Sequence, residues 1–381
     1  QAKRQATAAR ALARLARLLA AEGSDGAVER GAAVRSSEFE ALCACAAAPS
    51  VAQPDTEADA AMCADALRAL ATIASLQPAM DSGALPSGVA AAAAALAARI
   101  EPFATCLSGS AATGVAWACG RLGVRVGPAV ASAAERFPFD VSVGHLSHLD
   151  ELDTALLSRE IPFSHELLIT RTGDAVTERR ATCWMADEGV GGLAYSGKMM
   201  RPVPFTPAVA SVRDAVEAVS GHRFDCALIN WYEDGDCACA WHFDPDHGEC
   251  PPRDKWETTT VVVCVGQTRK FNFRPMPGDG KSSARGGEGN QHTFSVSHGD
   301  LVWMRRDCQD AWQHSVSRAE SAGGSQEHSE PRISIVFKRA HVLPGGGRGH
   351  PINARGSRKQ RREGAARGGD LPGGGRAGGR T

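Results

Sequence analysis

The sequence predicts an α+β protein built from three segments: a helical region over 1–136, a mainly β region over 137–342 and an unfolded basic tail over 343–381. Three observations support this division. Apolar residues recur at spacings of three and four in the first segment, whereas β-branched runs, aromatic residues and histidines become frequent in the second. The tail is dominated by glycine and arginine, with too few apolar side chains to offset the entropy of folding.

The first segment is rich in Ala and Leu and is interrupted by the turn sequences GSDG and PSG. Its opening stretch places Leu12, Leu15 and Leu19 on one helix face, which predicts an amphipathic helix, although the absence of acids before Glu22 also suits part of an organellar transit peptide. Further along, ATGVAWACGRLGVRVGPAVASAAERF resembles one unit of a helical-repeat protein. We therefore expect a repeat-like helical region.

The second segment contains a candidate metal-binding motif in AWHFDPDHGE. Side chains alternate along a strand, so His242 and Asp244 can point the same way. His314, within DLVWMRRDCQDAWQHSVS, is the best candidate for a third ligand. Two histidines and one carboxylate with open coordination positions form the ligand set of non-haem Fe(II) oxygenases. A solvated polar loop is the alternative reading of this motif.

A cationic strand follows in PRISIVFK. Alternation places Arg332, Ser334 and Lys338 on one face. Ile333, Ile335 and Phe337 lie on the other. A buried row with two cations needs an anion, and a dicarboxylate cosubstrate would supply one. The alternative is an edge strand whose cations are solvated.

Several motifs in this order resemble the AlkB-type Fe(II)- and 2-oxoglutarate-dependent dioxygenases: FDCALINWYEDG, WHFD, TTTVVVCVGQTRKFNFR, SHGDLVWMRRDCQDAWQHSV and PRISIVFK. The resemblance covers about 137–342. It implies a double-stranded β-helix, or jelly roll, that uses Fe(II), 2-oxoglutarate and O2. The implied reaction is oxidative demethylation of N-alkylated bases in DNA or RNA, with release of succinate, CO2 and formaldehyde.

The resemblance also implies roles for individual residues. Iron would be held by His242, Asp244 and His314. Lys338 stands where the family usually has arginine, which keeps the charge but loses a planar two-point contact. The expected contacts to 2-oxoglutarate are Asn230, Tyr232, Arg332, Ser334 and Lys338.

Residues 179–197, RRATCWMADEGVGGLAYSG, resemble the family's nucleotide-recognition lid. A base inside a duplex cannot reach such an iron, so the lid must hold a base that has been flipped out. Trp184 and Tyr195 are the candidates for stacking on that base, and Asp246 falls where the family approaches it. Packing of the two aromatic residues against the barrel, and a plain solvated acid at position 246, are the alternatives.

Charge and composition point to further properties. The tail holds nine Lys and Arg against two acids, so it should contact phosphates and favour single-stranded nucleic acid or RNA as partner. No stretch is long and apolar enough to cross a bilayer, and we expect a monomer without membrane contact. Twelve cysteines without a CxxC repeat suit reduced thiols and an intracellular location, in nucleus, cytoplasm or an organelle.

Two other functions remain open at this point. One is a dioxygenase of the same fold that hydroxylates or demethylates a protein or a small molecule. The other is a catalytically silent module that binds nucleic acid. An intact His/Asp/His set argues against the silent module, which has no need of open coordination sites.

Overall fold

The computed structural model describes residues 2–21, 36–48, 57–75, 87–169, 173–195, 198–247, 255–276, 291–319 and 330–341. The predicted basic tail over 343–381 lies outside these residues. None of the described helices combines the length and apolar character that a bilayer-spanning segment requires.

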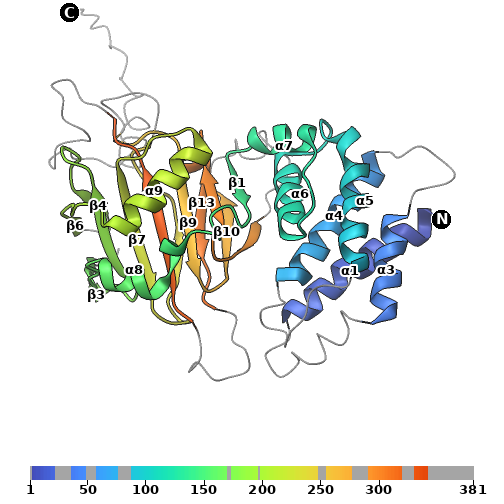
Figure 1. Cartoon of the computed structure of the whole chain (residues 1–381), viewed down its shortest axis with the longest axis horizontal. Helices are drawn as coiled ribbons and strands as arrows, with labels where there is room; N and C mark the ends of the chain where they lie inside the picture. The colour runs from blue at the N-terminus through green and yellow to red at the C-terminus, as the bar shows by residue number, and fades with distance from the viewer. Residues whose placement is uncertain are drawn as a thin grey trace, which may run out of the picture.

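Every regular element described before residue 136 is a helix, in agreement with the expected helical region. The repeat-like character of this region stays a prediction. These helices occupy one end of the molecule (Figure 1). They are α1 (Ala2–Ala21), α3 (Ser37–Ala47), α4 (Glu57–Ser75), α5 (Ser87–Ile100), η3 (Glu101–Phe103), α6 (Gly109–Arg121) and α7 (Pro128–Glu135).

Helix α4 forms the centre of this region and packs against α1, α5 and α6. Its residues Leu67, Leu70 and Ile73 recur every three residues, lie on one helix face and are fully buried. On α1, Leu12 is fully buried and Leu15 is partly buried, so the predicted amphipathic helix directs its apolar face into this core. Burial of regularly spaced apolar residues is therefore what holds the helices together.

The second part of the chain is mainly β, with two further helices, α8 (Thr154–Glu160) and α9 (Pro207–Ser220), and the short turns η4 (Asp150–Leu152) and α10 (Cys308–Ala311). The strands up to residue 232 are β1 (Phe139–Ser142), β2 (Leu167–Ile169), β3 (Ala175–Thr177), β4 (Ala181–Ala186), β5 (Leu193–Tyr195), β6 (Lys198–Met200) and β7 (Cys226–Tyr232). The later strands are β8 (Cys239–His242), β9 (Thr260–Gly266), β10 (Arg269–Pro275), β11 (His292–Val296), β12 (Leu301–Met304), β13 (Trp312–Val316) and β14 (Arg332–Lys338).

Two antiparallel sheets form the body of this region. One has six strands in the order β1-β12-β9-β14-β7-β4, and the other has four in the order β11-β10-β13-β8. Buried side chains from both sheets, including Val262 and Phe273, belong to one apolar cluster. Two separate hairpins, β2-β3 and β5-β6, complete the described strands.

The two faces of the six-stranded sheet differ in character. Helix α9 covers its outer face (Figure 1), where Val209, Val212 and Val216 pack in one cluster with Ile333 and Phe337. The opposite face of the same strands carries the polar residues of the cationic strand and looks toward the four-stranded sheet. Alternation along β14 thus directs its isoleucines and its phenylalanine toward α9 and its two cations and serine to the opposite face, as the sequence predicted.

The helical region is joined to the β region by specific polar contacts. The guanidinium of Arg121 on α6 pairs with Asp300, whose side chain is fully buried and also accepts hydrogen bonds from the backbone N–H of Gly144 at 2.8 Å and of Ser297 at 2.7 Å. The Trp117 indole N–H donates to the Ser295 carbonyl at 3.3 Å. These contacts anchor α6 to the segment that leads into β12.

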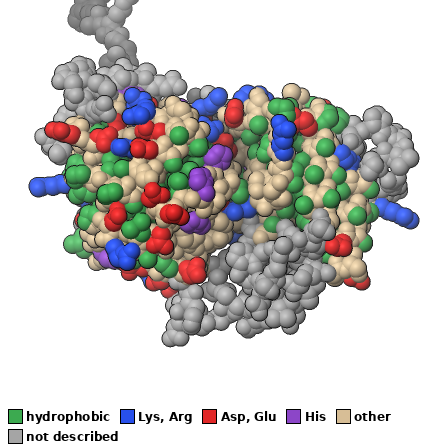
Figure 2. All heavy atoms as spheres, in the orientation of Figure 1, with side chains coloured by type: hydrophobic (Ala, Val, Ile, Leu, Met, Phe, Trp, Pro, Cys, Tyr) green, Lys and Arg blue, Asp and Glu red, His purple; other side chains and the backbone are tan. Residues whose placement is uncertain are grey.

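Acidic side chains are scattered over the part of the molecule where Figure 1 shows α8 and α9 (Figure 2). The end formed by the N-terminal helices shows mainly apolar and uncharged atoms in the same view (Figure 2).

Candidate metal centre and cosubstrate pocket

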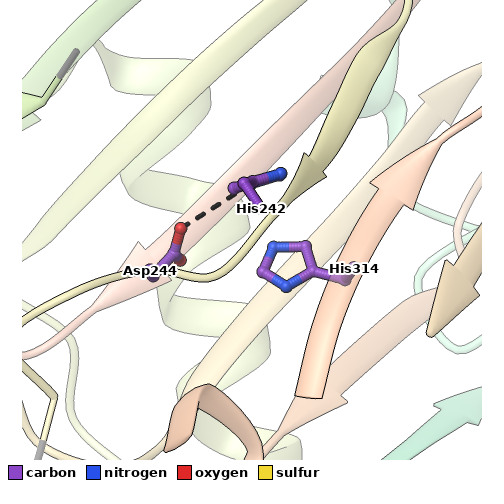
Figure 3. Close-up of side chains that lie close together, drawn as sticks. All are labelled: His242, Asp244 and His314. Atoms are coloured by element: carbon purple, nitrogen blue, oxygen red, sulfur yellow. Dashed lines mark ion pairs between the residues drawn. The ribbon is translucent and has the colours of Figure 1, made fainter. Parts of the chain in front are cut away.

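Three predicted ligands converge between two neighbouring strands of the four-stranded sheet. His242 ends β8, Asp244 follows it by two residues, and His314 lies in the middle of β13, directly opposite His242 in the strand register. One donor atom from each residue lies within 4.8 Å of the other two, and the imidazole centroids are 4.2 Å apart. Figure 3 shows the three side chains facing a common gap.

The local backbone differs from the expected single strand. Strand β8 ends at His242, so Asp244 is placed by the loop that follows, and its backbone N–H donates to Gln309 Oε1 at 2.9 Å. His314 is only 5% exposed, whereas the side chains of His242 and Asp244 remain 39% and 20% exposed. The three donors therefore form a cage that is closed on the sheet side and open on the other.

A bulge between β8 and β13 brings an unpredicted thiol into this cage. The pairs His314 with His242 and Val316 with Cys239 are two residues apart on β13 but three apart on β8. As a result Cys239 Sγ lies 3.6 Å from His242 Nδ1. Burial alone would lower the pKa of His242, but Cys239 and the nearby carboxylate raise it to about 9 in the absence of metal.

The imidazole of His242 is also oriented by its own backbone. Its Nδ1 lies 2.8 Å from the carbonyl oxygen of Ala240. A carbonyl can only accept a hydrogen bond, so Nδ1 carries a proton, and Nε2 is the nitrogen that can bind a metal after losing its own proton.

Lys338 faces the metal-ligand carboxylate rather than an empty pocket. Its ammonium, which is 3% exposed, pairs with Asp244 Oδ2. Burial alone would raise the pKa of Asp244, but Lys338 and the neighbouring imidazoles hold it well below its ordinary value. The Nε2 atom of His247 lies 3.4 Å from the same ammonium and 3.1 Å from Thr260 Oγ1. Burial, together with the charge of Lys338, lowers the pKa of His247 to about 3. His247 is thus a neutral neighbour of Lys338.

Arg332 occupies the other end of the same strand face. Its side chain is fully buried, and its Nε has no hydrogen-bond partner among the described residues. The remaining nitrogens reach the Gln267 carbonyl at 3.5 Å and Cys264 Sγ at 3.2 Å. The first partner is a backbone amide and the second is a thiol, so neither carries a formal negative charge. A buried guanidinium without a carboxylate partner in the described part of the chain is expected to receive one from a ligand.

The predicted cosubstrate residues lie in register across the central strands. Arg332 of β14 is opposite Tyr232 of β7, and Ser334 is opposite Asn230. Asn230 Nδ2 donates to Ser334 Oγ at 3.3 Å, and all four side chains are buried. Burial raises the pKa of Tyr232 to about 12, so its phenol is a neutral hydrogen-bond donor at physiological pH.

These residues fit both groups that such a site would require. Two imidazole nitrogens and one carboxylate oxygen are the donor set that suits a non-haem Fe(II) ion with open positions. The buried guanidinium of Arg332, with hydroxyl and amide groups beside it, suits one carboxylate of a dicarboxylic acid.

The three predicted substrate residues are placed differently from one another. Trp184 departs from the expectation of a stacking platform: it is 1% exposed, donates to the Gly191 carbonyl at 3.2 Å and packs edge-on against Trp256. The structure therefore favours its packing role, because a base needs an accessible ring face. Tyr195 ends β5, and its side chain lies outside the described part. Asp246 adopts a left-handed backbone with φ of 65° in the loop after the metal ligands.

Sequence reasoning missed Cys239, His247 and Gln309. A period-two pattern places Cys239 and His242 on opposite faces of β8, and a bulge leaves no mark in the composition. His247 belongs to the quoted motif AWHFDPDHGE, so its imidazole was a visible signal, but its partner lies 91 residues away in the chain. Gln309 lies 65 residues from the backbone that it contacts.

Together, the two antiparallel sheets, the His/Asp/His group and the buried arginine define a mononuclear metal enzyme that handles an anionic cosubstrate. The sequence profile of the 2OG-Fe(II) oxygenase superfamily matches residues 147–338. The chain belongs to this superfamily, and it is an AlkB-type dioxygenase.

Three relatives illustrate the similarity. Uncharacterized protein R406 of Acanthamoeba polyphaga mimivirus is 30% identical over 185 residues, which cover 48% of this chain and 85% of the viral protein. DNA oxidative demethylase ALKBH2 of Arabidopsis thaliana is 26% identical over 48% of this chain and 59% of its own length. Alpha-ketoglutarate-dependent dioxygenase alkB homolog 3 of Rattus norvegicus is 27% identical over 53% of this chain and 64% of its own length. The chain thus spans less than two thirds of the plant and rat relatives.

Proposed function

We propose that this chain oxidatively removes N-alkyl groups from bases in DNA or RNA, using Fe(II), 2-oxoglutarate and O2 and releasing succinate, CO2 and formaldehyde. The observation that carries the proposal is the combination of a His/Asp/His donor group with a buried arginine on β14 that forms no ion pair with a carboxylate among the described residues. The choice of nucleic acid as substrate is supported by the plant relative, which is named a DNA oxidative demethylase.

In this proposal His242, Asp244 and His314 hold Fe(II). When bound, iron and 2-oxoglutarate together supply the oxidant that hydroxylates the N-alkyl carbon. The chain itself contributes the three ligands from one side, which leaves the exposed side of the cage for cosubstrate and substrate. Lys338 acts by neutralising the carboxylate of Asp244 until metal arrives.

The cosubstrate pocket is formed by β7 and β14. Arg332 would pair with one carboxylate of 2-oxoglutarate, and the buried phenol of Tyr232 would donate a hydrogen bond to it. Asn230 and Ser334 form the next pair along these strands on the same face, toward Lys338, and would contact the same molecule. Because these groups come from paired strands, the ligand would meet a preformed rigid wall.

For the substrate, we propose that Tyr195 stacks on a flipped base and that Asp246 approaches the edge of that base. Tyr195 lies on the β5-β6 hairpin and Asp246 lies two residues beyond a metal ligand. Single-stranded nucleic acid or RNA is the preferred form, since its bases cost less to unstack and the basic tail suits a flexible phosphate backbone.

The wider organisation follows the same proposal. In this proposal residues 1–136 form a repeat-like helical region and 137–342 form the jelly-roll dioxygenase domain, while the basic segment 343–381 lies outside the described residues. The two facing antiparallel sheets support the jelly roll. We propose a monomer inside the cell, in nucleus, cytoplasm or an organelle, without membrane contact.

A panel of N-methylated DNA and RNA oligonucleotides, incubated with Fe(II) and 2-oxoglutarate and read by mass spectrometry, tests the function. Loss of the methyl group together with formaldehyde and succinate is the expected result, and His314→Ala is the inactive control. Succinate formed without demethylation of any oligonucleotide would indicate a protein or small-molecule substrate instead. Binding of oligonucleotides without any succinate would indicate a silent binding module.

A further inference from the structure

A buried cluster of charged side chains adjoins the proposed cosubstrate pocket. Glu178, which is 4% exposed, lies between two cations: its Oε1 is 2.6 Å from Arg180 Nη2 and its Oε2 is 2.7 Å from Lys198 Nζ. Lys198 also donates to Thr182 Oγ1 at 3.2 Å. Burial of charges is costly unless each one is paired, so the arrangement of these three groups is tightly specified.

The cluster makes direct contact with a cosubstrate residue. Arg180 Nε donates to Asn230 Oδ1 at 3.0 Å, while Asn230 Nδ2 donates to Ser334 Oγ at 3.3 Å. Thr182, Asn230 and Ser334 stand side by side in the registers of β4, β7 and β14. One amide is thus held at both ends, and the guanidinium determines that its oxygen points toward Arg180 and its NH2 toward Ser334.

The same cluster ties this wall to the hairpin of the proposed base-stacking residue. Lys198 begins β6 and lies opposite Tyr195 in the β5-β6 register. The Lys198 ammonium donates a hydrogen bond to Glu178, which lies outside the hairpin, three residues before β4. A continuous path of ionic and hydrogen-bond contacts therefore connects the hairpin to Asn230.

We propose that Arg180 is a positioning residue of the reaction, which orients the amide of Asn230 for 2-oxoglutarate and is itself held by the buried pair of Glu178 and Lys198. The proposal rests on the cosubstrate role proposed above for Asn230. Arg180 acts through that amide and need not touch the reacting atoms. Its planar guanidinium suits the task because two separate nitrogens, Nε and Nη2, serve Asn230 and Glu178 at a fixed spacing, whereas a lysine would have to reach both acceptors from a single nitrogen.

The test is the affinity of the full chain for 2-oxoglutarate, measured by titration calorimetry with Mn(II) in place of iron and without oxygen. Arg180→Lys keeps the charge but loses the two-sided geometry. We expect it to weaken 2-oxoglutarate binding about tenfold, the size of one lost charge-assisted hydrogen bond. Lys198→Met, which frees one side of Glu178, should weaken binding by a smaller factor of about three.

The matched control is Arg305→Lys. Arg305 pairs with Asp140 at 3.1 Å on the β1-β12 edge, and its side chain is 22% exposed compared with 15% for Arg180. This change should lower the unfolding temperature without altering 2-oxoglutarate affinity. Thermal unfolding of every variant identifies any loss of binding that comes from loss of the fold.

A double-mutant cycle with Asn230→Ala separates positioning from a general structural effect. If Arg180 works through Asn230, Arg180→Lys should change the affinity by less than about twofold once the amide is gone. Equal effects of Arg180→Lys in both backgrounds would overturn the positioning role while leaving the proposed function intact. Unchanged 2-oxoglutarate affinity in Asn230→Ala itself would remove the cosubstrate role of Asn230, and the present proposal with it.

Discussion

Replacing Lys338 by methionine should destabilise the metal-free protein and at the same time tighten its binding of divalent metal. The ammonium of Lys338 is 3% exposed and pairs with Asp244, a proposed iron ligand. Without Lys338 the carboxylate is left without its principal counter-ion when no metal is bound. A divalent ion would replace the missing positive charge.

The magnitude follows from the burial of the pair. Removing one partner of a fully buried ion pair costs about 3–5 kcal/mol. Asp244 keeps 20% of its side-chain surface exposed, and His242 Nε2 remains 3.8 Å from its Oδ1. We therefore expect a loss of about 2–3 kcal/mol in the free energy of unfolding without metal, and about 1 kcal/mol with saturating metal.

Denaturant unfolding of the wild type and Lys338→Met, each with chelator and with saturating Mn(II), measures both quantities. Thermodynamic linkage requires that the difference of about 1–2 kcal/mol reappear as a 5- to 30-fold lower Kd for Mn(II) in the variant. The matched control is Arg305→Met, which breaks the pair with Asp140 away from the proposed metal. Its loss of stability should be the same with and without Mn(II).

A stability loss in Lys338→Met that metal leaves unchanged would refute the reasoning. Such a result would mean that Lys338 stabilises the fold independently of the charge on Asp244. A higher Kd for Mn(II) in the variant would also refute it. By thermodynamic linkage, a higher Kd would mean that Lys338 favours metal binding instead of competing with the metal for Asp244.

Three further predictions follow from the described contacts. Alanine at His242, Asp244 or His314 should abolish Mn(II) binding and succinate formation, and calorimetry showing retained metal binding in any one variant would exclude that residue as a ligand. Arg332→Ala should raise the KM for 2-oxoglutarate at least about tenfold, because a charge-assisted pair is lost; an unchanged KM in succinate assays would place the dicarboxylate elsewhere. Burial and the nearby Arg68 lower the pKa of His292 from 6.5 to about 4, so folding favours the neutral imidazole. Stability should therefore rise by about 1–3 kcal/mol as pH increases from about 4 to 6.5, and urea unfolding of His292→Gln should lose this component.

Several parts of the fold could be predicted from local patterns. The spacing of Leu12 and Leu15 predicts one apolar face of the first helix, and the buried Leu12 and partly buried Leu15 of α1 confirm it. Alternation in PRISIVFK correctly separates Arg332, with the other polar residues, from the apolar face that packs under α9. Both patterns are readable because their periods are properties of the helix and the strand themselves.

The sheet order could not be predicted in this way. Strand β1 pairs with β12, so Phe139 lies opposite Met304, and Trp117 of α6 reaches Ser295. These partners lie far apart in the chain, and no local pattern records which distant strand or loop a segment will meet. The jelly-roll expectation came from resemblance rather than from residue spacing.

For the candidate site, the sequence by itself determined which donors are available and how they are spaced: imidazole and carboxylate in HFD, a further imidazole at His314, and cations at alternating positions of one strand. Tertiary structure alone decided what each of these groups meets. It paired Lys338 with Asp244, left Arg332 without a carboxylate in the described residues, and packed the Trp184 ring against a second indole. The physical reason is that donor type and side-chain alternation are local properties, whereas burial and charge pairing depend on neighbours that only the folded chain brings within a few ångströms.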